Sequence, residues 1–324
     1  MGESSEWAFP DELQPRAADL RFDLEAALDS LVLVRAEIPD DAFTASILGT
    51  ERIGNGVVIG ADGLVLTIGY LITEATAIWL TTNQGAAVAG YPLAYDQATG
   101  FGLIQPLGPL GVQPLARGSA AETHVGDAVV VAGHGGRAHA LKAKLFAKRE
   151  FAGYWEYVLD EALFTQPAHP QWGGAALISG EGRLLGIGSL LVQEQVDGNQ
   201  VQGNMIVPID LLEPILTDMV TLGRAKRPAR PWLGMYTTEV GGQLVVAGLA
   251  DNGPAARASV QVGDLVLEVA GERVTALPQL FRKIWSLGPP GTEVPMTLAR
   301  EGSIARVKVR SADRSDFLKK PQLH

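Results

Sequence analysis

The chain has 324 residues, enough for two domains, and its 47% hydrophobic and 19% charged content is ordinary for a globular protein with a sizeable core. The net charge is −10, and residues 1–229 alone carry a charge of −13, with 14 Lys/Arg against 27 Asp/Glu. Nucleic acid and anionic lipid are therefore poor candidate partners, because both would be repelled. The absence of cysteine excludes disulfides and thiolate chemistry.

Residues 1–50 form an N-terminal extension that begins polar and acidic. They lack the basic-then-apolar layout of a secretory signal, which predicts a cytoplasmic protein, or a periplasmic one if a leader has been trimmed. The chain has no apolar run long enough to span a membrane, so membrane insertion is not expected. Apolar residues recur at helical spacing from Asp23 to Leu31, and the apolar run 31–34 follows them.

Residues 51–223 have the texture of an all-β domain. Apolar runs at 56–59 and 64–67 flank Gly-Ala-Asp-Gly and predict a hairpin, and residues 128–132 predict a fully buried strand. Similar runs flank the glycine turns at 179–182 and 197–199, so the domain is expected to be a barrel or a sandwich. Asp210 and Glu213 predict a capping box that starts a helix, and Gly223 is expected to end this helix.

Residues 224–231 are basic and rich in proline, which predicts a linker, and residues 232–311 predict a second compact domain. In it, strands are expected at 243–249, 264–269, 294–299 and 304–309, with a helix at 277–287. Gly253-Pro-Ala-Ala-Arg-Ala predicts a turn into a short helix. The polar tail, residues 312–324, is expected to be loose.

The stretch 165–177, Thr-Gln-Pro-Ala-His-Pro-Gln-Trp-Gly-Gly-Ala-Ala-Leu, resembles the nucleophile loop of HtrA-type serine proteases, which reads Asn-Pro-Gly-Asn-Ser-Gly-Gly-Pro-Leu. The attacking serine's position is Gly173. In the phrases 66–72 and 96–104, which resemble the family's histidine and aspartate phrases, Tyr70 and Gly100 occupy the triad positions. The resemblance covers roughly residues 30–310 and implies a mainly β fold: a chymotrypsin-like double β-barrel followed by an α+β PDZ domain.

The resemblance implies that no catalytic residue is present, because the triad is degenerate. Glycine has no nucleophile, and a phenol with a pKa near 10 is a poor base at neutral pH. Losing one triad member already costs on the order of 10⁴ to 10⁶ in turnover. Gln171 and Trp172 stand where the family's oxyanion loop has Gly and Asn, so the oxyanion site is expected to be lost as well. Trp172 either folds into the old specificity pocket or packs on a neighbouring strand.

The second domain is similar to the PDZ domains of bacterial proteases. Such a module binds an extended peptide as an added strand and holds its C-terminal carboxylate with successive backbone N–H groups. The resemblance places this loop at Leu233, Gly234 and Met235, with Trp232 directly before them as a further peptide-binding residue. Leu280 and Ile284 lie four residues apart and would line the groove, or else are ordinary core residues.

Other chemistry has little support in the sequence. The only serines between Arg52 and Arg227 are Ser119, Ser179 and Ser189, and none stands in a Gly-x-Ser-x-Gly elbow. The spacing of the histidines and the lack of an accompanying acidic pair give no metal set, so no metal or cofactor is expected. The histidines in this region are expected to lie on the surface or to be hydrogen-bonded in loops.

We therefore expect a catalytically inactive HtrA-like protein that acts as a peptide-binding scaffold or regulator. Its expected partners are extended or C-terminal peptides of other proteins. The alternative is a hydrolase with residual or non-standard activity. The resemblance also leaves two roles open for Trp7 and Phe9, which either dock on the chain itself or resemble the aromatic contacts through which family members form trimers. A homotrimer or co-assembly with active relatives is thus expected if the second role holds.

Overall fold

The computed structural model describes residues 7–196 and 199–320, which divide into two compact units. The first unit comprises Met1–Arg149, Glu161–Lys226 and Lys319–His324, and the second comprises Glu150–Asp160 and Arg227–Leu318. The expected boundaries at 223 and 232 fall near one of these divisions. The 150–160 segment joins the second unit although it lies within the predicted protease-like domain.

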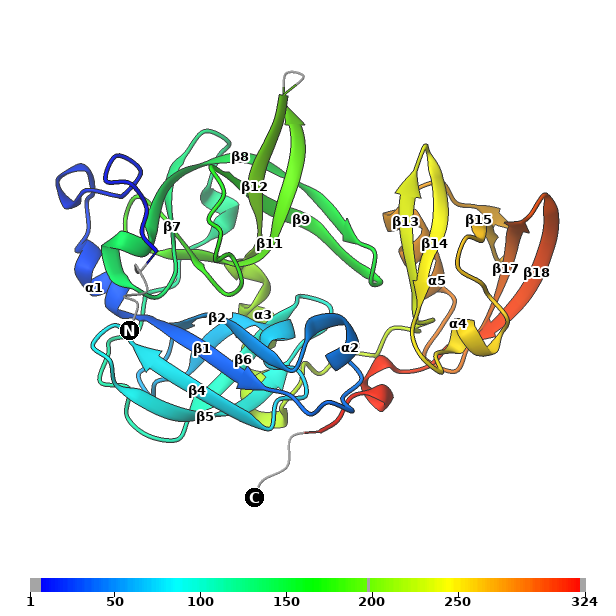
Figure 1. Cartoon of the computed structure of the whole chain (residues 1–324), viewed down its shortest axis with the longest axis horizontal. Helices are drawn as coiled ribbons and strands as arrows, with labels where there is room; N and C mark the ends of the chain where they lie inside the picture. Colours follow the sequence, from blue (N-terminus) through cyan, green and yellow to red (C-terminus); the bar gives the residue numbers. More distant parts are fainter. Residues whose placement is uncertain (1–6, 197–198, 321–324) are drawn as a thin grey trace, which may run out of the picture. The chain divides into compact units, whose positions relative to one another are not determined.

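The first unit contains two rings of antiparallel strands (Figure 1). The first ring closes in the order β1-β2-β3-β6-β5-β4 and has a core of continuous apolar runs. Its strands are β1 (Leu31–Glu37), β2 (Glu51–Val58), β3 (Val65–Ile68), β4 (Ala77–Thr82), β5 (Ala87–Tyr95) and β6 (Phe101–Pro106). The short helices α1 (Leu24–Asp29) and α2 (Ala45–Leu48) precede β1 and β2, and the Asp23 carboxylate caps α1 by accepting from the Ala26 amide at 3.1 Å.

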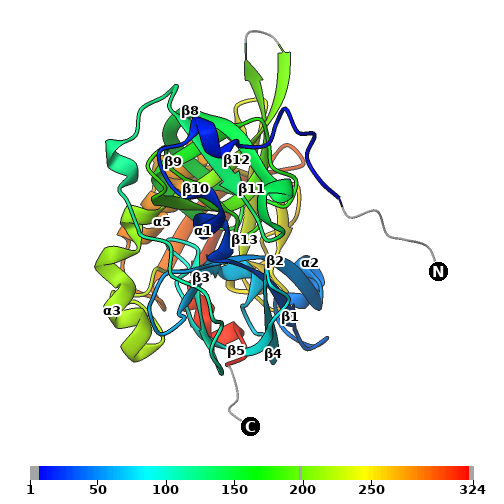
Figure 2. The ribbon, with the colours of Figure 1, turned by 90° about the vertical axis from the view of Figure 1, so that its left-hand side faces the viewer.

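The second ring has the order β10-β11-β12-β9-β8-β7. Its strands are β7 (Ala128–Ala132), β8 (Ala140–Gly153), β9 (Tyr157–Gln166), β10 (Ala176–Ile178), β11 (Leu184–Val196) and β12 (Asn199–Pro208). The long hairpin arms β8 and β9 extend into the 150–160 segment of the second unit. Helix α3 (Glu213–Leu222) follows and, in Figure 2, lies on the side of the first unit away from α2.

The second unit is a PDZ-like sheet with short helices. The strand order is β13-β14-β15-β17-β18, so β13 lies at an edge, and β16 pairs with β15. The strands are β13 (Met235–Val240), β14 (Gln243–Leu249), β15 (Leu265–Val269), β16 (Glu272–Arg273), β17 (Glu293–Arg300) and β18 (Ser303–Arg310); the helices are α4 (Pro254–Arg257) and α5 (Leu277–Ser286). Leu280, Phe281 and Ile284 of α5 are fully buried against this sheet.

The 3₁₀ helices complete the described elements: η1 (Ala17–Asp19), η2 (Gly69–Leu71), η3 (Ala120–Glu122), η4 (Gly136–His139), η5 (Ile209–Leu211) and η6 (Arg314–Phe317). Within the described part of the chain, no helix is both long and apolar enough to cross a membrane.

The architecture confirms the predicted mainly β fold class, but the predicted cap at the start of α3 is wrong. Asp210 does not cap α3, because its carboxylate accepts instead from the Ser119 hydroxyl and the Ala120 amide, both at 2.6 Å. The predicted end of α3 is confirmed: Gly223 adopts φ 70° and its amide bonds back to Met219.

The tail beyond residue 311 is ordered as far as it is described, so the expectation of a loose segment fails there. Ala312 forms a backbone bridge to Trp232, and the Phe317 ring packs edge-on against Trp232 at 4.9 Å. In the first unit, the Lys319 amide donates to the Glu74 carboxylate at 2.9 Å. Backbone pairing and one buried ring contact thus offset the polar composition on which the prediction was based. Residues 321–324, and most of the predicted turn at 197–199, lie outside the described residues.

Candidate functional site

The three positions assigned to the degenerate triad lie close together in the first unit. Tyr70 belongs to η2, directly after β3. A Cβ atom added at Gly173 would lie 2.9 Å from the Tyr70 hydroxyl. Gly100 lies on the other side of the same turn, where its carbonyl accepts from the Gly69 amide at 2.7 Å. The fold therefore brings together two glycines and a phenol.

The Tyr70 phenol is held as a hydrogen-bond donor. Its hydroxyl donates to the Ser189 carbonyl at 2.9 Å. Burial raises the pKa of Tyr70 well above its ordinary value, and a hydrogen bond to the Trp172 side chain offsets only part of this shift. At neutral pH the phenol keeps its proton, so it cannot serve as a general base.

The buried guanidinium of Arg52 fixes the turn that carries Tyr70. Its Nη1 atom donates to the carbonyls of Tyr70 at 2.6 Å and Thr73 at 3.1 Å, and Nη2 donates to the Thr44 hydroxyl at 2.7 Å. Burial lowers the pKa of Arg52 to about 10, and the nearby Glu74 charge acts in the opposite direction. The guanidinium remains charged at neutral pH, and its visible role is to position the turn.

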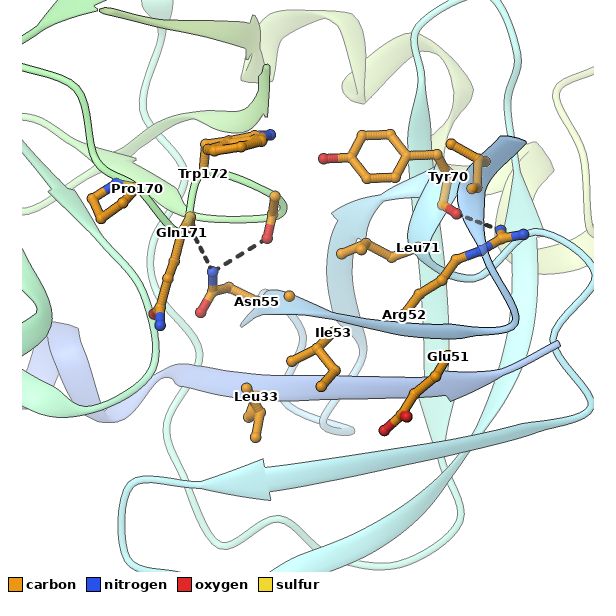
Figure 3. A pocket seen from close by; sticks show the side chains of 13 residues that line it. Leu33, Glu51, Arg52, Ile53, Asn55, Tyr70, Leu71, Pro170, Gln171 and Trp172 are labelled. Carbon is orange, nitrogen blue, oxygen red and sulfur yellow. Dashed lines mark hydrogen bonds between the residues drawn. The ribbon is translucent and has the colours of Figure 1, made fainter. Parts of the chain in front are cut away.

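Asn55 of β2 anchors the loop around Gly173. Its Nδ2 atom donates to the carbonyls of Gln171 at 2.9 Å and Gly173 at 3.2 Å (Figure 3). The Asn55 amide also donates to the Gly173 carbonyl at 2.8 Å. Gly174 adopts φ 77°, and a Cβ there would lie 1.8 Å from the Asn55 carbonyl oxygen. Glycine is therefore required at position 174 by both the backbone conformation and the available space.

A buried histidine holds the same loop from the other side. His169 is fully buried, and its Nδ1 accepts from the Gln171 amide at 3.1 Å while Nε2 lies 3.0 Å from the His139 carbonyl. Burial lowers the pKa of His169 to about 4. The ring is thus neutral, with its proton on Nε2, and the Gln171 amide, at the position expected to supply an oxyanion contact, is already bonded within the loop.

The sequence analysis did not predict that His169 holds the Gly173 loop, because nothing in the sequence distinguishes a buried histidine from an exposed one. The structure shows His169 hydrogen-bonded in a loop, as expected of these histidines, and not at the surface. Its main chain is also paired with Asn204 of β12, whose Oδ1 accepts from the His169 amide at 2.7 Å.

The aromatic residues of the N-terminal extension dock on this histidine. Phe9 packs edge-on against His169 at 5.1 Å, and its amide donates to the Ala138 carbonyl at 2.9 Å. Trp7 lies 4.7 Å from the His139 ring and 5.7 Å from the His169 ring. The structure therefore shows both aromatic residues docked on the same chain, and the role in trimer contacts stays a prediction.

A cavity of about 430 Å³ opens beside the Tyr70 and Gly173 positions. Trp172 lines it, and Figure 3 shows the indole facing the phenol of Tyr70. The wall is mostly apolar or main chain, with one buried cation and one carboxylate at the rim. It comprises Leu33, Leu48, Glu51, Arg52, Ile53, Gly54, Asn55, Tyr70, Leu71, Pro170, Gln171, Trp172 and Gly173.

The three serines considered as alternative nucleophiles make other contacts. The Ser119 hydroxyl donates to Asp210, and the Ser179 hydroxyl accepts from the amides of Glu181 at 3.1 Å and Arg183 at 3.2 Å in a hairpin turn. Ser189 is buried and contacts Tyr70 through its carbonyl. Among the residues that the structure describes, no group of three His, Asp or Glu side chains could hold a metal ion.

The predicted peptide-binding loop presents three consecutive amides in one direction. The N–H groups of Leu233, Gly234 and Met235 all donate to one carboxylate, that of Glu156 in the 150–160 segment of the same unit. Gly234 adopts φ 67°, which lets the turn form. Trp232 does not take part through its amide, which donates to the Ala312 carbonyl at 2.9 Å.

The predicted groove residues on α5 share one face, as their spacing requires. Leu280 and Ile284 are fully buried in the core of the second unit, together with Leu233 and Met235. Val158 of the hairpin segment belongs to the same cluster. Local sequence patterns did not indicate that Glu156 and Val158 would lie beside this loop, because both are far from it along the chain.

Two family models match the chain: "Trypsin-like peptidase domain" at residues 54–187 and "PDZ domain" at residues 231–310. The curated relatives include the serine endoprotease DegS of Haemophilus influenzae, 24% identical over 276 residues that cover 81% of this chain and 77% of DegS. The periplasmic serine endoprotease DegP of Escherichia coli strain K12 is 23% identical, with 79% of this chain and 56% of DegP covered. The chain thus spans little more than half of DegP.

Solved structures show the same fold. The HtrA-type protease AlgW with a decapeptide superimposes with a TM-score of 0.52 at 16% identity, covering 93% of this chain and 100% of AlgW. A serine endoprotease from Yersinia pestis gives a TM-score of 0.51 at 19% identity, covering 91% and 99%.

Proposed function

Because the chain is an HtrA-family serine endoprotease homologue with one PDZ domain, we propose that it is catalytically inactive and works by binding peptides. It would act as a scaffold or regulator whose partners offer extended segments or C-terminal carboxylates. Assembly with copies of itself or with active relatives is part of the same proposal. Its main support is the juxtaposition of Tyr70 and Gly173, where an active member of the class needs a base and a nucleophile.

The chemistry of the first unit supports the loss of activity. Acyl transfer needs an attacking atom, a proton acceptor beside it and amides aimed at the developing oxyanion. Gly173 supplies no attacking atom, and Tyr70 keeps its proton because burial raises its pKa. The Gln171 amide is already bonded to His169. Each of the three requirements therefore fails for a separate physical reason.

The geometry of the second unit supports peptide binding. Three consecutive amides that converge on one carboxylate are the means by which such domains hold a peptide C-terminus. The edge position of β13 next to this loop offers the main-chain groups of an added strand. Apolar side chains of α5 lie beside both, which favours peptides with an apolar last residue.

The catalytic half of the proposal is tested by incubating the full chain with a fluorophosphonate probe and, separately, with casein. We expect neither labelling nor digestion, with trypsin as the positive control. Labelling that disappears in Ser189→Ala would overturn the proposal and establish the alternative, a hydrolase with a non-standard serine.

The binding half is tested by titrating the full chain into fluorescein-labelled decapeptides that end in a free apolar residue. The same peptides with an amidated C-terminus are the control. We expect saturable binding of the free acids that Gly234→Glu abolishes, because the new carboxylate would repel the ligand from the loop. Equal binding of acids and amides would contradict recognition through the three amides.

A further inference from the structure

The tip of the β8–β9 hairpin is part of the second unit. Residues 150–160 belong to it, and Val158 is buried in its core beside Leu280 and Ile284. Arg282 of α5 forms ion pairs with both Glu150 and Asp160, one on each arm of the hairpin. The tip is therefore docked on the groove formed by the loop, β13 and α5.

The Glu156 side chain occupies the carboxylate-binding loop. Its Oε1 accepts from the amides of Leu233 at 3.1 Å, Gly234 at 2.8 Å and Met235 at 3.2 Å, and Oε2 accepts from Leu233 at 3.1 Å. The residue is 7% exposed. The carboxylate thus holds the donors that a peptide C-terminus would need, so the two cannot be bound at once.

The turn that carries Glu156 also makes one main-chain hydrogen bond to the edge strand of the sheet. The Tyr154 carbonyl accepts from the Thr237 amide of β13 at 3.1 Å, and the Tyr154 ring lies edge-on to Tyr236 at 6.1 Å. A peptide that extends a sheet makes the same two kinds of contact, with main-chain bonds to the edge strand and a terminal carboxylate in the loop. The turn Tyr154–Glu156 therefore makes one contact of each kind, a main-chain bond to β13 and a carboxylate in the loop.

This docking also has costs, which a competitor could relieve. Glu156 adopts φ 61°, a left-handed conformation that is unfavourable for a residue other than glycine. Burial raises the pKa of Glu156 to about 7, against the three amides and the charge of Arg314, which favour the ionised form. Tyr236, Tyr154 and Asp251 are the other titratable groups nearby. The contact is thus favourable, but it contains a desolvated carboxylate and a strained residue.

We propose that the segment Tyr154–Glu156 is an internal competitor that closes the PDZ groove, so that a C-terminal peptide binds only by displacing it. This inference rests on the proposed peptide-binding function and adds its regulation. The closed form lowers the apparent affinity for an external peptide in proportion to the fraction of molecules whose loop is open.

The test compares two variants of the full chain with the wild type. Glu156→Gln removes the charge and places an NH2 group, at the Oε2 position, against the Leu233 amide. Glu156→Gly removes the whole side chain and suits the left-handed backbone, so it keeps the fold if the first variant does not. Glu161→Gln is the matched control, since Glu161 lies on β9 with an exposed side chain that pairs with Lys148.

Two readouts separate this inference from the function on which it rests. The first is the NMR shift of the Leu233, Gly234 and Met235 amides without peptide, which we expect to change in both Glu156 variants and not in the control. The second is the affinity for a fluorescein-labelled decapeptide with a free C-terminal valine, which we expect to rise at least about tenfold in both Glu156 variants. The amidated peptide should gain nothing.

Equal affinity of the free-acid peptide for the wild type and both variants would overturn the internal competitor and leave the proposed function standing. Unchanged loop amides in both variants would overturn it too. If the amides move and no peptide binds to any of the proteins, the peptide-binding function fails, and the competitor role fails with it.

Discussion

Restoring a serine at the nucleophile position should not restore a protease. In Gly173→Ser the new Cβ would lie 2.9 Å from the Tyr70 hydroxyl, closer than such atoms approach without a shift. The hydroxyl that follows it would meet a phenol whose own proton is donated to the Ser189 carbonyl. The variant therefore gains a nucleophile without gaining a proton acceptor.

The size of the deficit follows from the protonation state of Tyr70. An ordinary tyrosine is ionised in about one molecule in a thousand at pH 7, and burial lowers this fraction further. General-base assistance contributes roughly 10²- to 10⁴-fold, and loss of single triad members costs on the order of 10⁴ to 10⁶. We expect casein hydrolysis by Gly173→Ser to stay at least about 10⁴-fold below that of trypsin.

The assay combines fluorophosphonate labelling with casein digestion for Gly173→Ser and for the triple variant Tyr70→His, Gly100→Asp, Gly173→Ser. The single variant should label no faster than the parent chain, and any gain should appear first in the triple variant. Circular dichroism checks that both remain folded. Rapid labelling of the single variant would refute the reasoning, because it would show that a base exists beside Gly173 without a histidine.

The remaining predictions concern the loop around Gly173. His169 keeps a pKa of about 4 when folded, below its ordinary 6.5, so the unfolded chain binds the proton first and stability falls as pH drops through that window. Between about pH 7.5 and about pH 5 the loss should be about 2 kcal/mol, and urea unfolding of His169→Asn should lack this component; identical pH slopes would contradict it. Gly174→Ala should cost at least about 3 kcal/mol by thermal unfolding, because its Cβ meets the Asn55 carbonyl, whereas Gly180→Ala, with no neighbour within 4 Å, should change stability by less than about 0.5 kcal/mol. Equal losses in the two glycine variants would refute the steric argument.

Local sequence patterns were sufficient to predict secondary structure where burial and turn-forming residues act over short stretches. The strand Ala128–Ala132 was predicted to the residue, since a continuous apolar run follows Gly126-Asp127. Alignment of the flanking phrases also assigned Tyr70 and Gly173 to neighbouring working positions, and a Cβ added at Gly173 would lie 2.9 Å from the Tyr70 hydroxyl. These predictions depend on order along the chain, which sequence shows directly.

Long-range polar contacts could not be predicted in this way. Glu156 lies 77 residues before Leu233, and a glutamate in a short turn carries no local signal that its carboxylate will be buried. Asp210 illustrates the same limit, because donors 90 and 91 residues away compete successfully for a carboxylate that local spacing assigned to a helix cap. Hydrogen-bond partners at such separations are chosen by the tertiary fold.

The division of the second unit between two distant stretches also affects the order in which it can form. During synthesis, the turn with Glu156 and Val158 is made well before the strand that starts at Met235. The Glu156 carboxylate and the Val158 side chain therefore reach their contacts in the second unit only later. Closing such a long loop has an entropic cost, which slows the formation of contacts between the two stretches. Val158 can therefore reach its buried cluster only after β13, α5 and the later strands of the second unit have been made.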